Sequence, residues 1–371
     1  MCLFYEDSYE EVARKLVFSL QQMSSWSTSW HVPSSPAITQ ARTRLGDAPL
    51  RALFDRTAYP VATLGTKGAW LNSRRLMAVD GFTLDVPDTP ENVAEFGLQH
   101  DGTGVASRSS YPTVRVIGLG ECGSHAIVDA TLGGFSTGEQ TLLPEVFRSF
   151  EPEMLVMLDA GFYSYNLWRS ALATGAALLW RVSSSLTLPV LKTFPDGSYL
   201  SVIYRTNLKP HHRLAIADSI RKNELISAVQ ALTVRVIEYD IPDRDTKKPG
   251  ETIRLITSIL DHEDTSAIEL AAAYHERWEY EGLIDEIKTH QRGPGRVLRS
   301  KTPILVKQEI WSLLLTHYAV RALMCRAADE ADVDPDRLSF IRSIRVIRRQ
   351  IIAQADFSPS PPEKSTPPHT Q

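Results

Sequence analysis

Residues 268–291 read IELAAAYHERWEYEGLIDEIKTHQ, and the pattern of this stretch organises the rest of the chain. The stretch contains one glycine and no proline and is rich in Ala, Leu, Glu, Lys and Arg, so it predicts one long helix. Tyr274, Arg277, Glu281 and Lys288 follow the spacing Y-x2-R-x3-E-x6-K. At about 100° per residue, these side chains lie near 0°, 300°, 340° and 320° around the axis, on one narrow face.

One acid, two cations and a phenol on a single helical face suit a phosphodiester. A carboxylate ligates a divalent metal ion, while arginine, lysine and a tyrosyl hydroxyl hold phosphate oxygens. The alternative is a solvated face on which Arg277 and Glu281 form an i,i+4 pair. Two aspartates upstream of the helix favour the first interpretation.

These aspartates end two predicted strands of a mixed sheet. LMAVD ends at Asp80, and FTLDV, TVRVIGLG and HAIVDATLG follow, which indicates an antiparallel meander of three strands with Asp80 in the first. MLVML is an unbroken apolar run, as expected of a buried parallel strand, and it ends at Asp159. Both carboxylates therefore lie at strand ends, where a sheet exposes polar groups.

Helical and β-rich segments surround these strands. Helices are predicted over 139–150, opened by a capping box from Ser136 to Glu139, and over 163–174, before a strand over 176–182. The predicted regions are an N-terminal helical region (1–58), a ribonuclease-H-like domain (59–183 and 265–300), a β-rich insertion (184–264), a C-terminal helical region (301–356) and a disordered tail (357–371); the resemblance described below implies that the first binds DNA and the second is catalytic.

Asp80, Asp159 and Glu281 are far apart in the sequence, but their positions converge in a ribonuclease-H-like sheet. Three adjacent carboxylates repel one another and raise their pKa values, so the arrangement is stable mainly when divalent metal neutralises it. Two hard cations bridged by carboxylates activate water or a DNA 3′-hydroxyl and stabilise the leaving oxygen of an in-line displacement. Magnesium is the expected ion.

Composition sets limits on the partners and the compartment. The formal net charge of the 371-residue chain is -4, so any sign of nucleic-acid binding must be local. Residues 287–350 supply it, with 13 Lys and Arg against 6 Asp and Glu. The three cysteines share no ligand-like spacing, which predicts a reducing cytosol, and no apolar run spans a bilayer. The first five residues, MCLFY, begin like the middle of an element and predict a truncated N-terminus.

Basic residues outside the main helix are ambiguous. Arg42, Arg44, Arg51 and Arg56 make the N-terminal helices a possible DNA-contact module or, equally, a solvated surface. A cluster of cationic residues either contacts the DNA backbone or, as predicted here, lies in a solvated loop: Lys209, His211, His212 and Arg213.

Three sequence signatures together resemble the bacterial DDE transposases of the insertion-sequence-four family. They are AVDGFTLDVPDTPEN around Asp80, LDAGF around Asp159, and the full Y-x2-R-x3-E-x6-K pattern. ITQARTRLG and LRALF also resemble the N-terminal domain of that family, so the resemblance covers residues 5–351. It implies a ribonuclease-H-like α/β fold: a mixed sheet with flanking helices, interrupted by a β-rich insertion, with N-terminal and C-terminal helical regions.

The resemblance also implies an activity and a set of partners. The expected enzyme cleaves DNA and transfers strands at the inverted-repeat ends of an insertion sequence, using two Mg2+ ions for which Mn2+ substitutes. The implied partners are the terminal inverted repeats and target DNA, in a homodimeric synaptic complex without a membrane, in the cytoplasm and on the nucleoid. The implied site residues are Asp80, Asp159 and Glu281 as catalytic metal ligands and Tyr274, Arg277 and Lys288 as DNA-binding residues.

A flipped base in a hairpin intermediate would require an aromatic clamp. Trp168, Trp180 and Trp278 are available, but an aromatic residue near a sheet usually belongs to the core. The sequence leaves the clamp unassigned.

Two motifs point to other classes of protein. Gly118, Gly120 and Gly123 match the dinucleotide fingerprint G-x-G-x-x-G, but the following SHAIVDATLG alternates like a strand, so a hairpin turn is predicted instead of a phosphate loop. Gly134-Phe-Ser136-Thr-Gly138 matches the G-x-S-x-G elbow of α/β-hydrolases. A hydrolase using Ser136, with a base among His211, His212 and His317, is therefore an alternative. A catalytically dead, DNA-binding transposase remnant is another.

Overall fold

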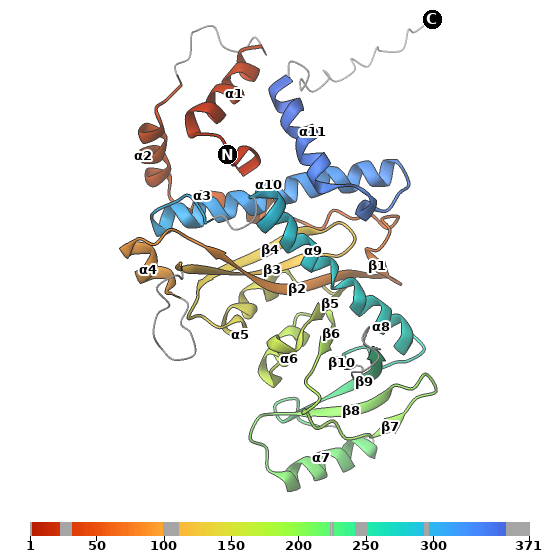
Figure 1. Ribbon diagram of the computed structural model, residues 1–371. Helices are drawn as coiled ribbons and strands as arrows, with labels where there is room; N and C mark the ends of the chain where they lie inside the picture. Colours follow the sequence, from red (N-terminus) through yellow and green to blue (C-terminus); the bar gives the residue numbers. More distant parts are fainter. Residues whose placement is uncertain are drawn as a thin grey trace, which may run out of the picture.

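A single mixed sheet runs through the molecule in the computed structural model, which describes residues 2–22, 32–98, 111–222, 224, 226–241, 251–292 and 297–353 (Figure 1). Its ten strands lie in the order β4-β3-β2-β5-β6-β10-β9-β8-β7, with β1 paired to β2 off this path. The strands are β1 (Trp70–Leu71), β2 (Arg74–Asp85), β3 (Thr113–Glu121), β4 (Ala126–Gly134), β5 (Met154–Leu158), β6 (Ala177–Arg181), β7 (Lys192–Thr193), β8 (Tyr199–Tyr204), β9 (Ala231–Ile241) and β10 (Glu251–Thr257).

Helices flank this sheet and build both ends of the chain. The α-helices are α1 (Tyr9–Gln22), α2 (Ser35–Leu45), α3 (Ala48–Thr57), α4 (Pro90–Phe96), α5 (Glu139–Leu142), α6 (Tyr165–Leu172), α7 (Pro210–Arg221), α8 (Ala267–Glu276), α9 (Glu279–Asp285), α10 (Pro303–Glu330) and α11 (Phe340–Ala353). Shorter turns are the 3-10 helices η1 (Cys2–Phe4), η2 (Leu143–Ser149), η3 (Ala160–Phe162) and η5 (Pro335–Arg337) and the π-helix η4 (Glu286–Gln291).

The first half of the sheet has ribonuclease-H topology. β2, β3 and β4 form the predicted antiparallel meander, and β5 pairs in parallel with both β2 and β6. All five residues of β5 are buried, as its unbroken apolar run predicts for a central parallel strand. The predicted ribonuclease-H-like mixed sheet is confirmed.

The two faces of the sheet are covered by different helices. Because side chains alternate along a strand, Ala78 and Phe82 of β2 enter the core shared with α8, α9 and α10. Met77 and Val79 enter the core shared with η2 and α6 on the opposite face. Figure 1 shows α10 on one side of β2–β4 and α5 and α6 on the other. Even-numbered positions of β2 therefore face α8 to α10.

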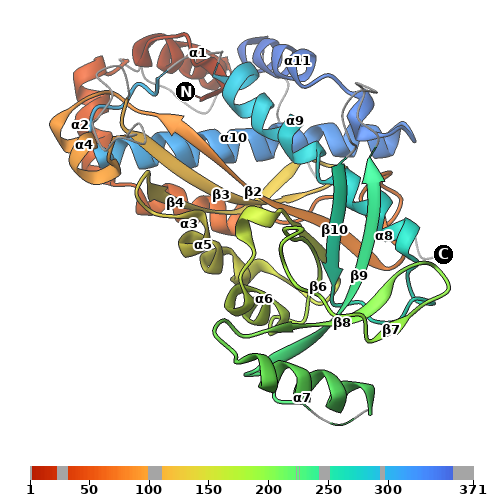
Figure 2. The same ribbon diagram turned by 60° about the horizontal axis from the view of Figure 1, so that its bottom comes forward.

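The segment predicted as a β-rich insertion continues the same sheet. β10 pairs with β6 in antiparallel fashion, and β9, β8 and β7 follow in order (Figure 2). The predicted turn at residues 195–197 connects β7 to β8. The predicted solvated loop at 209–213 is wrong, because His211 and His212 lie in the first turn of α7, where Pro210 starts the helix.

The long helix predicted over 268–291 is divided into three parts. A capping box between Ser266 and Glu269 starts α8. Between α8 and α9 the backbone bonds tighten to i,i+3 spacing, as in Tyr280 N to Arg277 O and Glu281 N to Trp278 O, both 3.0 Å. η4 then widens into a π-helix. The single 3.6-residue period therefore does not hold through to Lys288, which lies in η4.

The predicted capping box at Ser136 is wrong. α5 starts after Gly138 and has no side-chain cap, and Ser136 is an exposed turn residue. The helix predicted over 139–150 changes from α5 to the 3-10 helix η2 at Leu143, because Pro144 has no N–H to continue the α-helical bonds.

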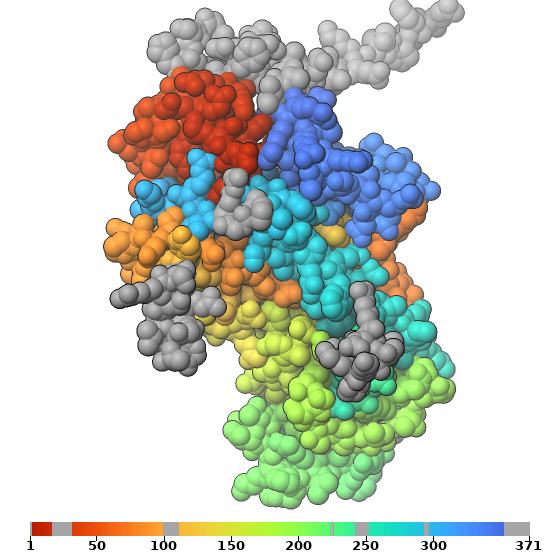
Figure 3. All heavy atoms as spheres, in the orientation of Figure 1, coloured from red at the N-terminus to blue at the C-terminus, as the bar shows by residue number. Residues whose placement is uncertain are grey.

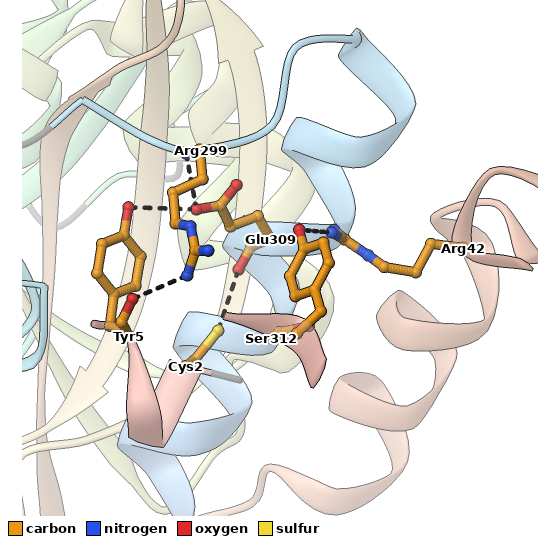
Figure 4. A pocket seen from close by; sticks show the side chains of 7 residues that line it. Cys2, Tyr5, Arg42, Arg299, Glu309 and Ser312 are labelled. Carbon is orange, nitrogen blue, oxygen red and sulfur yellow. Dashed lines mark hydrogen bonds between the residues drawn. The ribbon is translucent and has the colours of Figure 1, made fainter. Parts of the chain in front are cut away.

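A small cavity joins the N-terminal residues to α10 (Figure 4). Arg299 donates to Tyr5 O at 2.9 Å, and the Arg299 backbone N–H donates to Glu309 Oε1 at 3.0 Å. Arg42 donates to Gln308 Oε1 at 3.1 Å. The cavity has a volume of about 50 Å3, enough for a few waters. Of the four N-terminal arginines proposed for DNA contact, Arg42 thus binds the protein itself.

No helix within the described residues has both the length and the apolar character needed to cross a membrane.

Candidate active site

Asp80 and Asp159 lie side by side on neighbouring parallel strands. The strand end predicted at Asp80 is wrong, because β2 continues to Asp85, whereas Asp159 directly follows the last residue of β5. Val79 of β2 is in register with Leu158 of β5. The residue that follows each of them is an aspartate, so Asp80 and Asp159 are neighbours on the same face of the sheet. Burial raises the pKa of Asp80 above its usual value, and the nearby Asp159 carboxylate raises it further, while the Gly81 N–H and Arg277 oppose both. The predicted meeting of these two carboxylates is present in the structure.

The end of α8 supplies the groups that contact this acidic pair. Arg277 Nη1 lies 2.9 Å from Asp80 Oδ2, with 7% and 23% of the two side chains exposed. The Tyr274 hydroxyl donates to Asp159 Oδ1 at 3.4 Å, and Arg181 Nη1 lies 3.8 Å from the same oxygen. Two guanidinium groups and a phenol therefore surround two carboxylates.

Glu281 and Lys288 lie further along the same segment. Glu281 is exposed and follows Arg277 by one helical turn, and Lys288 is half-buried in η4. The carboxylates of Asp80, Asp159 and Glu281 do not all lie within 4.8 Å of one another. Figure 3 shows the α8–α9 segment, teal to cyan, on the molecular surface between the N-terminal region and the insertion. The structure thus brings together four of the six predicted site residues.

A different acidic group lies beside this segment. His125 Nε2 is 3.4 Å from Glu279 Oε2 and 3.0 Å from Asp336 Oδ1, and these are the three ligand-type side chains that the described residues bring within 4.8 Å. Burial lowers the pKa of His125, but the two carboxylates outweigh burial and raise the pKa to about 8. Nothing in the spacing of these residues predicts the group, because they come from three separate elements.

This group does not have the chemistry of a metal centre. Because the pKa of His125 is raised to about 8, its ring carries an extra proton at neutral pH, and a protonated nitrogen has no lone pair for a metal ion. Arg321 Nη2 contacts the other ring nitrogen, Nδ1. Arg321 also pairs with Glu286, which is 3.0 Å from His317 Nε2. The group is one end of a buried ion-pair network between α9, η4, α10 and η5.

The alternative sites lack their expected partners. Among the described residues, no histidine forms a hydrogen bond with Ser136. His317 is fully buried on Glu286, and His211 and His212 lie on α7, within the insertion. The predicted hairpin is present, since β3 and β4 are antiparallel and Gly123 lies in the turn between them. Gly118 and Gly120 lie inside β3, so they form neither the predicted turn nor a phosphate loop.

The three tryptophans left open for a base clamp differ in exposure. Trp168 and Trp180 are fully buried, with ring centroids 5.6 Å apart, whereas 55% of Trp278 is exposed. The two buried rings are core residues.

A ribonuclease-H-like sheet with paired carboxylates on neighbouring parallel strands, contacted by arginine, is typical of enzymes that break phosphodiester bonds with divalent metal. Comparison with known proteins identifies the family. Residues 71–318 match the model of the transposase DDE domain, and residues 1–55 match the N-terminal domain of insertion element 4 transposases. The chain belongs to the DDE transposases of the insertion-sequence-four family.

Two relatives from Escherichia coli are similar in sequence to this chain, and one solved structure aligns with it. The chain is 28% identical over 352 residues to the transposase InsG for insertion sequence element IS4 of Escherichia coli (strain K12), covering 94% of this chain and 74% of that protein. It is 31% identical over 132 residues to the putative transposase InsZ of the same organism, covering 35% of this chain and 43% of InsZ. A cryo-EM structure of the piggyBac transposase synaptic complex with hairpin DNA aligns with a TM-score of 0.42 and 11% identity, over 95% of this chain and 79% of that one. The predicted transposase function is confirmed, and the comparisons give the hydrolase reading no support.

Proposed function

We propose that this transposase cleaves DNA at the inverted-repeat ends of its insertion sequence and transfers the strands to target DNA. Asp80, Asp159 and Glu281 would hold two Mg2+ ions, for which Mn2+ substitutes. The observation that carries the proposal is the juxtaposition of Asp80 and Asp159 on one face of the sheet, under the helix that bears Glu281. The proposed partners are the inverted repeats and target DNA, in a homodimeric synaptic complex on the nucleoid.

The donor set fits hard divalent cations. Asp80 and Asp159 are carboxylates on neighbouring parallel strands, and an added cation would lower the pKa of Asp80, which is raised mainly by burial. Bound metal would supply Lewis-acid activation of the attacking hydroxyl and stabilisation of the leaving oxygen. Glu281 is the remaining acid on this helix, and its participation requires α9 to approach the two aspartates more closely.

The cationic side chains have a separate role in the proposal. Arg277 neutralises Asp80 in the free protein, and its buried guanidinium would bind a phosphate of the transposon end that reaches the acidic pair. The Tyr274 hydroxyl donates to Asp159 and so orients its carboxylate. The same hydroxyl would be available to a phosphate oxygen beside the acidic pair. Lys288 would contact a phosphate further along the strand.

The test uses supercoiled plasmid carrying the repeats that flank this gene, with Mg2+ or Mn2+. Asp80→Asn, Asp159→Asn and Glu281→Gln should each abolish strand cleavage and leave plasmid binding within about twofold of wild type, because each keeps side-chain volume and removes one charge. Asp218→Asn is the control: this carboxylate is exposed on α7 and pairs with Arg221, so cleavage should be unchanged. Cutting by any of the three site variants at the wild-type rate contradicts the assignment of that residue.

A further inference from the structure

Two glycines of strand β3 make room for the side chain of Tyr280. A Cβ on Gly118 would lie 2.2 Å from the Tyr280 hydroxyl oxygen, and a Cβ on Gly120 would lie 2.8 Å from Tyr280 Cε2. Tyr280 itself is 2% exposed. The Tyr280 ring therefore packs directly against the backbone of β3, in space that the side chain of any larger residue at 118 or 120 would occupy.

This slot lies directly beside Asp80. Gly118 is the cross-strand partner of Asp80 in the β2–β3 ladder. Side chains of directly opposed residues point to the same face with Cβ atoms about 4.5–5.5 Å apart. Because the Tyr280 oxygen occupies the place of the missing Gly118 side chain, it takes the position of a cross-strand neighbour of the Asp80 carboxylate.

The Tyr280 hydroxyl is buried without a hydrogen-bond partner. Burial raises the pKa of Tyr280 well above its usual value, and the Asp80 charge raises it further, so the hydroxyl keeps its proton. Buried hydroxyls nearly always have a partner, because an unpaired one loses its hydration and gains nothing. Phenylalanine would fill the same space without burying an unpaired hydroxyl. Packing alone therefore does not explain why residue 280 is a tyrosine.

The Asp80 carboxylate can accept a further hydrogen bond, in addition to those from its present partners. Its Oδ1 accepts from the Gly81 N–H at 2.7 Å and its Oδ2 is paired with Arg277 at 2.9 Å. If Arg277 transfers to a DNA phosphate, Asp80 loses one of these two partners. Carboxylates that ligate metals are in turn held by hydrogen bonds from neighbouring groups, which fix their orientation.

We propose that Tyr280 is a positioning residue for Asp80, whose hydroxyl donates to the carboxylate when it ligates metal, and that Gly118 and Gly120 are glycines because this phenol must reach Asp80. The inference rests on the proposed function, since it takes Asp80 as a metal ligand. Tyr280 touches neither DNA nor the reacting atoms, and it acts through the orientation of Asp80.

The test is Tyr280→Phe, measured by Mn2+ binding to DNA-free protein in electron paramagnetic resonance titrations and by thermal unfolding without metal. We expect about tenfold weaker Mn2+ binding, the lower end for removing a partner of a metal ligand, and an unfolding temperature equal to or above that of wild type. The Mn2+ concentration for half-maximal plasmid cleavage should rise by a similar factor. Unchanged Mn2+ binding, or a lower unfolding temperature with normal binding, would overturn the proposal.

Gly118→Ala separates the hydroxyl from the space it occupies. Alone, this variant should lower the unfolding temperature, because the new Cβ meets the Tyr280 oxygen at 2.2 Å. Combined with Tyr280→Phe it should recover, since the next atoms, Tyr280 Cζ and Ile127 Cγ2, are both at 3.6 Å. The stable double variant should still bind Mn2+ about tenfold more weakly, and wild-type binding by it would count against the role of the oxygen.

Two further variants separate failure of this inference from failure of the proposed function. Asp80→Asn should remove Mn2+ binding at the site, and if it does not, the proposed metal site is wrong. If Asp80→Asn abolishes binding and Tyr280→Phe has no effect, only the positioning role is wrong. Tyr318→Phe is the matched control: its hydroxyl donates to Tyr59 O at 3.1 Å, away from Asp80, and its loss should leave Mn2+ binding unchanged.

Discussion

Replacing Arg277 by glutamine removes the cation that neutralises the acidic pair in the free protein. The Arg277–Asp80 pair has a 2.9 Å contact and exposures of 7% and 23%. At an effective dielectric constant of about 20, its gross attraction is roughly 6 kcal/mol. Much of this offsets desolvation, and breaking one side of a buried pair typically costs about 3–5 kcal/mol. Because Asp80 keeps some solvent contact, we expect about 3 kcal/mol.

The assay is thermal unfolding with and without Mn2+, in the absence of DNA. A loss of about 3 kcal/mol should lower the unfolding temperature by roughly 4 °C, because a chain of 371 residues unfolds with an entropy of about 0.8 kcal/mol/K. Without Arg277, Asp80 and Asp159 repel each other with only Arg181 nearby, so a divalent cation gains more by binding between them. Saturating Mn2+ should therefore raise the unfolding temperature of Arg277→Gln more than that of wild type.

Arg221→Gln is the matched control for this prediction. The Arg221–Asp218 pair has the same 2.9 Å contact, but 48% and 63% of its side chains are exposed. Its loss should change stability by less than about 1 kcal/mol, because water screens both charges. Equal destabilisation by the two variants, or equal Mn2+ stabilisation of Arg277→Gln and wild type, would refute the account of the acidic pair.

Two other predictions concern a tight turn and the ion-pair network. Gly123→Ala should lower the free energy of unfolding, measured by chemical denaturation, by at least about 3 kcal/mol, because φ is +75° and the new Cβ would lie 2.8 Å from Ala69 N. Gly97→Ala is the control: φ is +77° but the space around it is open, so the loss should be about 1–2 kcal/mol. Since the pKa of His125 is raised to about 8, its contribution of roughly 2 kcal/mol should be complete below pH 6.5 and lost as pH rises through about 8. Denaturation at pH 6 and pH 9 should show this loss in wild type and a smaller one in Asp336→Asn, and equal pH dependence of the two proteins would contradict it.

The site buries charged and polar groups whose lost hydration costs free energy in the free protein. Two carboxylates on neighbouring strands and two arginines beside them lose part of their hydration, and the Tyr280 hydroxyl is buried without a partner. Such groups persist where a function needs them, because substitutions that relieve the cost also remove the chemistry. Variants that raise stability at this site should accordingly lower activity.

Local patterns in the sequence determined the strands and the chemistry of the main helix. The alternation in β2 to β4 and the apolar run of β5 that ends before Asp159 are properties of short segments, so the sequence alone shows them. The end of the first strand at Asp80 was wrong, because β2 continues to Asp85. The ribonuclease-H-like class follows from the order of these segments. The Ser136 capping box failed for a local reason as well, since the turn before α5 leaves that side chain in solvent.

Tertiary structure alone decided which groups meet. Pairing of Arg277 with Asp80 depends on how α8 packs over the sheet, and the His125, Glu279 and Asp336 group joins residues from a turn and two helices. The slot for Tyr280 exists because β3 and α9 approach so closely that a single Cβ would collide. The tightened turn after α8 and the π-helix η4 change the direction in which Glu281 and Lys288 project from the helix axis. A uniform α-helix, as predicted from the sequence, would place them on the same face as Tyr274 and Arg277. Spacing along a chain sets the order of side chains, but their distances across the molecule depend on packing between elements that are remote in sequence.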